Sequence, residues 1–244
     1  MYSFLFIGNS YTYYNDMPAI FRGFAEAAGY EVDVTAITKG GYRLSQFADP
    51  ADECGAAVEA ALKGEKKYDF VILQEQSLLP ATEDVADFYD AVRNLAERIS
   101  VTGAKPILYA TWGRREGAAP LCEKGWTNES MTWRLAAAYQ AIGDEVCAPV
   151  SYAGLAFYDV YTHHPEIPLY DGDGSHPSYE GSYLAAATLF ARIFDTYPDM
   201  VGYHGELSSE VSGVLCDAAG KAIFETPLIP TEYHTRSRWV TRLS

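Results

Sequence analysis

The sequence predicts an α/β protein with three layers, in which helices cover both faces of a parallel sheet of about five strands. Three observations predict this architecture. Short apolar runs alternate along the chain with longer amphipathic segments, which is typical of β-α-β units. The chain has 244 residues, enough to bury both faces of such a sheet. No proline- or serine-rich linker interrupts the pattern, so we expect one domain over residues 1–226 and a separate C-terminal tail, residues 227–244.

The predicted strands are short and apolar, as expected for strands that are buried on both faces. Glycine or proline lies next to several of them, and these residues commonly begin or end a strand. The five strands are expected at residues 2–7, 31–37, 69–73, 107–111 and 146–150.

Amphipathic helices are predicted between the strands and after the last one. The clearest has Val85, Phe88, Val92, Leu95 and Ile99 on one face, with Thr82 as its expected N-cap. The others are expected at 16–28, just after Pro50, and at 131–142, 152–161, 178–193 and 211–223. The intervals 113–128 and 163–177 show no periodicity and are predicted to be loops.

Candidate functional residues follow the strands. In open parallel sheets, sites form beyond the carboxyl ends of the strands, and those ends meet at one edge. Three motifs follow the first three predicted strands: Gly8-Asn9-Ser10, Gly40-Gly41 and Gln74-Glu75-Gln76. The sequence therefore predicts that these motifs lie together.

A serine, a histidine and an aspartate form the second signal. Ser10 follows the first strand, and Asp173 and His176 lie three residues apart just before the helix predicted at 178–193. A serine needs a base to become a nucleophile at neutral pH, and the imidazole needs an acid to orient it. Ser10 taken alone is most often a turn or cap residue, and the three together favour a serine hydrolase.

With these motifs, the sequence resembles the SGNH hydrolases, also called GDSL-type esterases. Gly8-Asn9-Ser10 corresponds to the family's first block and Asp173-Gly174-Ser175-His176 to its last. The resemblance implies a flavodoxin-like fold and a Ser10–His176–Asp173 triad that needs no metal or organic cofactor. It also implies an oxyanion hole formed by the N–H groups of Ser10 and of a glycine after the second strand. Gly41 matches that glycine best, and Gly40 is the next choice.

Two blocks depart from the family pattern. Asn9 replaces the acid that usually precedes the nucleophile. The family's Gly-x-Asn-Asp block, whose Asn donates to the oxyanion, is replaced by Gln74-Glu75-Gln76-Ser77. A Gln side chain is also an N–H donor, so Gln74 or Gln76 is expected to take this role, and the sequence does not choose between them.

Other residues near the predicted site are candidates for binding substrate. They are Asn9, Gly40, Tyr42 and Trp112, the last of which follows the fourth strand. An aromatic side chain there can stack against a sugar or simply pack in the core, and both remain open for Trp112.

Composition excludes several classes of protein. The net charge of −15 and a pI of about 4.6 disfavour binding to nucleic acid. No apolar run is long enough to cross a membrane, and the four cysteines have no spacing typical of a zinc site. A predicted strand begins directly after Met1, so we expect no signal peptide and a cytoplasmic location.

The sequence thus predicts a serine esterase that removes a short acyl group, such as an O-acetyl group on a small molecule or carbohydrate. A lysophospholipase or thioesterase of the same family is an alternative, and so is a carbohydrate-binding protein that has lost catalysis. A flavodoxin-type nucleotide binder is disfavoured, because the turn at residues 8–12 is too short for a phosphate loop.

Overall fold

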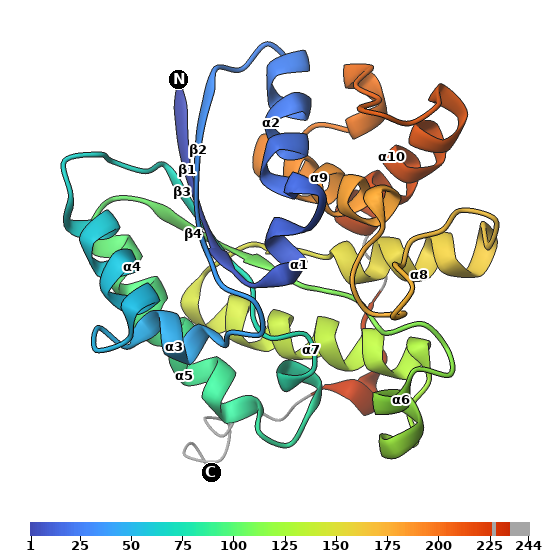
Figure 1. Cartoon of the computed structure of the whole chain (residues 1–244), viewed down its shortest axis with the longest axis horizontal. Coiled ribbons are helices and arrows are strands. Elements are labelled where there is room, and N and C mark those ends of the chain that lie inside the picture. Colours follow the sequence, from blue (N-terminus) through green and yellow to red (C-terminus); the bar gives the residue numbers. More distant parts are fainter. Residues whose placement is uncertain (226–227, 235–244) are drawn as a thin grey trace.

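The computed structural model describes residues 1–225 and 228–234, and these residues form three layers around one sheet (Figure 1). Five parallel strands pair in the order β2-β1-β3-β4-β5. Their bounds are β1 (Tyr2–Gly8), β2 (Val32–Thr38), β3 (Phe70–Leu73), β4 (Lys105–Tyr109) and β5 (Val150–Ser151). The predicted fold class is confirmed.

Helices cover both faces of the sheet (Figure 1). One face carries α2 (Met17–Ala27), α9 (Tyr179–Phe194) and α10 (Ser209–Phe224). The other carries α3 (Leu44–Ala48), α4 (Glu53–Lys63), α5 (Val85–Val101) and α7 (Asn128–Val146). Helix α8 (Ala153–His163) contacts both α7 and α10. The short helices α1 (Ser10–Tyr13) and α6 (Ala119–Lys124) lie in connections.

The apolar stripes predicted from the sequence form the core. Phe88, Val92, Leu95 and Ile99 of α5 are fully buried, as are all four residues from Phe4 to Ile7 in β1. Ser178 caps α9, since its hydroxyl accepts a hydrogen bond of 3.0 Å from the N–H of Gly181. This cap begins the helix directly after the loop that carries Asp173 and His176 (the acid–base loop, residues 164–177).

Several local predictions are wrong. The interval 113–128 contains α6, a helix of only six residues that is too short for its periodicity to show. Thr82 does not cap α5, because its hydroxyl donates to the carbonyl of Leu79 in the preceding turn. Strand β5 is shorter than expected, because Val146 still belongs to α7 and Cys147 ends that helix in a left-handed conformation.

The C-terminal tail is described in part. Residues 228–234 contain the short 3-10 helix η4 (Thr231–Tyr233), and residues 226–227 and 235–244 lie outside the described residues. The division into a domain and a tail therefore stays a prediction. Among the described helices, none has the length and apolar character that a membrane span requires.

Candidate active site

Ser10 lies in a tight turn, residues 8–12 (the nucleophile turn), where β1 passes into α1. Asn9 is the N-cap of α1, and its side-chain oxygen accepts a hydrogen bond of 3.1 Å from the N–H of Tyr11. Gly8 is required just before it, because a Cβ atom there would lie 2.4 Å from the hydroxyl oxygen of Thr12. The turn therefore places Ser10 as the first helical residue, at the carboxyl edge of the sheet.

The loop after β2 is tied to this turn. The Asn9 amide donates to the carbonyl of Tyr42 over 2.9 Å, and the N–H of Tyr42 donates to the carbonyl of Lys39. Gly41 has a φ of +73°, which suits the third position of this turn. Within residues 1–225 and 228–234, the N–H groups of Ser10 and Gly41 donate to no other group. Both remain available to an incoming oxygen.

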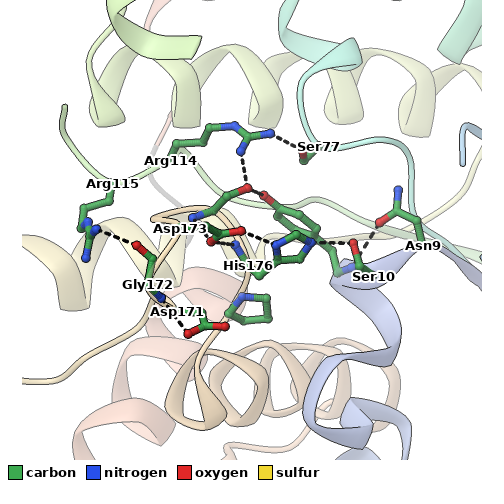
Figure 2. Close-up of polar contacts among 12 residues, drawn as sticks. Asn9, Ser10, Ser77, Arg114, Arg115, Asp171, Gly172, Asp173 and His176 are labelled. Atoms are coloured by element: carbon green, nitrogen blue, oxygen red, sulfur yellow. Dashed lines mark hydrogen bonds and ion pairs between the residues drawn. The ribbon is translucent and has the colours of Figure 1, made fainter. Parts of the chain in front are cut away.

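Figure 2 shows Ser10, His176 and Asp173 in one hydrogen-bonded series. Ser10 Oγ lies 2.8 Å from His176 Nε2, and His176 Nδ1 lies 2.5 Å from Asp173 Oδ2. Residues that are 166 positions apart in the chain are thus within hydrogen-bond reach. The three side chains can pass a proton from the hydroxyl to the imidazole while the carboxylate holds the ring.

Asp173 is adapted to stay ionised. Partial burial raises the pKa of its carboxyl group, but hydrogen bonds from the His176 ring and from the N–H groups of His176 and Ser175 outweigh it. The net result is a pKa below the ordinary value for aspartate. Asp173 is therefore a carboxylate at neutral pH, as a group that orients an imidazole and stabilises imidazolium must be.

The His176 ring is also fixed by its neighbours. Tyr14 stacks on it, with 4.4 Å between ring centroids and 14° between planes. The Trp112 indole donates to the carbonyl of Ser175 over 3.1 Å, and the Asn15 amide donates to the carbonyl of Pro177 over 3.1 Å. These contacts tether the loop on both sides of the histidine.

A protein from Slackia heliotrinireducens, described as a candidate SGNH hydrolase, is 34% identical in sequence to this chain. The similarity covers 79% of this chain and 98% of that one, with a TM-score of 0.68. The chain belongs to the SGNH hydrolases. A DUF4886 family protein from Bacteroides uniformis shares the fold over 95% of this chain and 98% of its own, at 20% identity and a TM-score of 0.78. An acetyl xylan esterase shares it over 78% of this chain and 99% of its own, at 13% identity and a TM-score of 0.58. No protein-family model and no curated protein matches the sequence.

The third block of this SGNH hydrolase contains two glutamines with different environments. Gln74 is fully buried, and its oxygen accepts from the N–H of Asn9 at 2.8 Å and from the hydroxyl of Thr12 at 2.9 Å. Its nitrogen donates to the carbonyl of Glu75. Both ends of the amide are engaged, so the structure does not support Gln74 as an oxyanion donor.

Gln76 keeps its donor free. Its side-chain oxygen accepts from the N–H groups of Leu78 at 2.8 Å and Leu79 at 3.0 Å, which fixes the orientation of the amide. Among the described residues, its Nε2 group has no hydrogen-bond partner. Of the two candidates, Gln76 alone has an amide nitrogen to offer.

The predicted substrate-binding residues also divide into buried residues, whose side chains are engaged within the protein, and accessible ones. Trp112 is fully buried and stacks on Phe157 at 3.9 Å between centroids, which favours packing in the core over stacking against a sugar. Asn9 is almost fully buried, with its amide engaged at both ends, and it positions the two loops of the site. Gly40 is exposed and Tyr42 is half-buried, so both stay candidates.

Three further residues, to which the sequence assigns no specific role, have contacts at this site. Tyr14 stacks on the histidine, and Arg114 reaches the acid–base loop from the end of β4. Glu75 is fully buried and accepts from the N–H groups of Leu44 and Gln76, which joins the ends of two loops. Glu75 lies within the third predicted motif, and Tyr14 is one of several tyrosines that the sequence gathers next to the predicted nucleophile, but no local pattern marks Arg114.

Proposed function

We propose that this protein is a serine esterase in which Ser10, His176 and Asp173 form the catalytic triad. The observation that carries the proposal is the continuous series from Ser10 Oγ through both nitrogens of His176 to Asp173. Membership of the SGNH hydrolases supports the same reaction class.

In the proposed reaction, His176 Nε2 takes the proton of Ser10 as the hydroxyl oxygen attacks the ester carbonyl. Asp173 accepts the Nδ1–H bond throughout and stabilises the imidazolium. The imidazolium then donates the proton to the leaving alcohol, and an acyl-serine remains. Water, activated by the same imidazole, releases the acid and restores Ser10.

The oxyanion hole is proposed to consist of three donors. These are the N–H groups of Ser10 and Gly41, both unused in the described structure, and the Nε2 group of Gln76. Each donor is fixed before substrate arrives: the first two by the turns that Asn9 joins, the third by the bonds from Leu78 and Leu79. Preorganised donors of this kind stabilise the transition state most.

The substrate is proposed to be a short acyl ester, with an O-acetylated carbohydrate as the best candidate. Tyr13 supports a carbohydrate, because this residue is 41% exposed beside the nucleophile turn and its hydroxyl lies next to Gly40. An exposed tyrosine offers both a stacking face and a hydrogen-bonding hydroxyl to a sugar ring. The shared fold of an acetyl xylan esterase is consistent with such a substrate. The mechanism requires no metal and no organic cofactor.

Labelling and hydrolysis test this function together. Wild type, Ser10→Ala and the exposed control Ser100→Ala are treated with a fluorophosphonate probe and then with p-nitrophenyl esters from acetate to dodecanoate. We expect wild type and Ser100→Ala to be labelled and to hydrolyse acetate fastest, and Ser10→Ala to do neither. Absence of labelling in wild type would contradict catalysis and favour a binding protein. Faster turnover of dodecanoate than acetate would favour a lysophospholipase or thioesterase.

A further inference from the structure

Arg114 is a cation that is fixed at the catalytic edge of the sheet. It follows β4, and its two terminal nitrogens donate to the hydroxyls of Ser77 (3.0 Å) and Ser175 (Figure 2). Both serines are buried, and they belong to the loop after β3 and to the acid–base loop. The guanidinium group is therefore held in one orientation between two loops of the site.

Hydrogen bonds connect the Arg114 guanidinium to residues that are adjacent in sequence to the triad. Ser175 directly precedes His176, and its hydroxyl lies 2.6 Å from the hydroxyl of Tyr11, which directly follows Ser10. Ser77 directly follows Gln76, the proposed third oxyanion donor. Arg114 thus donates to Ser175, the neighbour of His176, and to Ser77, the neighbour of Gln76, and among the described residues it has no hydrogen bond to the triad itself.

The charge of Arg114 is not neutralised by the described part of the chain. No carboxylate oxygen of residues 1–225 or 228–234 lies within 4.0 Å of it, and its Nε group is buried without a hydrogen-bond partner. Three other arginines of the described residues pair with carboxylates: Arg93 Nε lies 2.5 Å from Glu145, Arg98 lies 2.6 Å from Glu59 and Arg43 lies 3.6 Å from Asp87. What sets Arg114 apart is its position at the catalytic edge, held by two buried serines. Two serine hydroxyls occupy two of the five guanidinium donors and supply no negative charge.

We propose that Arg114 binds a carboxylate on the alcohol part of the ester substrate, an inference that rests on the proposed function. A planar guanidinium fork matches a carboxylate in both shape and charge. The alcohol part is the relevant side, because its oxygen must approach His176 to be protonated, and Arg114 is bonded to the residue before that histidine. The substrates are then O-acyl esters of hydroxy acids, and acylated sugar acids fit both this charge and the exposed tyrosine.

Matched esters test the assignment. The substrates are 3- and 4-acetoxybenzoate, each compared with the neutral acetoxybenzamide of the same shape. The proteins are wild type, Arg114→Gln, Arg114→Lys and the control Arg134→Gln, which removes the same charge from an exposed position on α7. We expect kcat/KM of wild type and the control to favour one carboxylate ester by about ten-fold over its amide. Arg114→Gln should reduce this preference to about two-fold or less, mainly through KM, and Arg114→Lys should retain part of it.

Product inhibition of wild type provides a measurement that needs no variant. Hydrolysis of p-nitrophenyl acetate should be inhibited about ten-fold more strongly by hydroxybenzoate than by hydroxybenzamide. Two results would overturn this inference and leave the esterase proposal intact. One is that wild type hydrolyses the charged and the neutral ester with equal kcat/KM; the other is that Arg114→Gln loses the same fraction of kcat/KM for both esters. Failure of wild type to react with the fluorophosphonate probe and with every ester would overturn both.

Discussion

The nucleophile turn and the acid–base loop, which meet at Ser10 and His176, are built in opposite ways. Ser10 is 7% exposed, and beside it Asn9 and Gln74 are almost or fully buried, with every end of their amides hydrogen-bonded. The side chains of Asp173 and His176 are 50% and 27% exposed and lie on a loop between helices. One half of the site is part of the core, and the other rests on its surface.

This difference separates stability from reactivity. In the buried half, each amide satisfies groups on two or three chain segments, so its loss leaves unpaired polar atoms in the core, which are costly. In the exposed half, the Asp173 carboxylate accepts three hydrogen bonds, but it is half exposed, so water can replace lost partners. We therefore expect substitutions in the nucleophile turn to lower stability, and those of Asp173 and His176 in the acid–base loop to lower mainly the rate.

The largest effect is expected from Asp173→Asn. Loss of the carboxylate removes the group that orients His176 and stabilises imidazolium, and it should lower kcat by about 1,000- to 10,000-fold. The neighbouring Asp171→Asn is the control, because Asp171 is exposed and, within the described part of the chain, its side chain accepts a hydrogen bond only from the N–H of Gly172. Steady-state kinetics and thermal melting measure both variants. A large loss of melting temperature in Asp173→Asn would contradict the division between the two halves.

The two carboxylates of the site allow a second test, on stability. Burial raises the pKa of Glu75 to about 7, although the N–H groups of Gln76 and Leu44 oppose this effect. Because this folded-state pKa exceeds the unfolded value of 4.5, its stabilising contribution is full below pH 4.5 and is lost as the pH rises through 7. The free energy of unfolding should therefore fall relative to Glu75→Gln by on the order of 3 kcal/mol over this range.

Urea unfolding of wild type and Glu75→Gln at several pH values measures this difference, and the contributions of all other groups cancel between the two proteins. Parallel pH profiles would show that Glu75 does not titrate in this window. Asp173 has the opposite sign: its lowered pKa contributes stability above the unfolded value, and that contribution is lost as the pH falls.

Patterns along the chain were enough to predict most of the strands and to predict that three motifs lie together at one edge of the sheet. The number of strands and the positions of all but β5, the buried face of α5 and the edge that gathers residues 8–10, 40–41 and 74–76 follow from periodicity and from the geometry of parallel sheets. Ser10, Asp173 and His176 were predicted because residue type and spacing carry their chemistry. The structure brings these three together, and their catalytic role stays a proposal.

The partners of the amides could not be predicted from the sequence. Gln74 and Gln76 are the same residue two positions apart, and only the bonds from Asn9 and Thr12 on one side, and from Leu78 and Leu79 on the other, distinguish them. Trp112 and Arg114 are likewise near neighbours after β4, yet one packs in the core and the other reaches the loops. Side-chain direction at a strand end depends on tertiary contacts that no local pattern encodes.

Gln76→Glu isolates the proposed oxyanion donor. Glutamate keeps the oxygen that accepts from Leu78 and Leu79 but lacks the N–H group, so kcat should fall about 100-fold with little change in melting temperature. Gln74→Glu is the matched control and should instead unfold at lower temperature, because it buries a charge in the core. Unchanged kcat in Gln76→Glu would exclude Gln76 from the oxyanion hole.

Asn9→Asp restores the acid that most SGNH hydrolases have before the nucleophile, and it has the smallest expected effect. In this chain the Asn9 amide must donate to the carbonyl of Tyr42, whereas its oxygen caps α1. An aspartate keeps the cap but places a buried carboxylate against a carbonyl oxygen, so the free energy of unfolding should fall by about 1–3 kcal/mol. Asp16→Asn on the exposed side of the same segment is a control for the exchange of the two residue types. If Asn9→Asp were as stable as wild type, Tyr42 would not depend on this donor, and the tie between the nucleophile turn and the Gly41 loop would have to come from elsewhere.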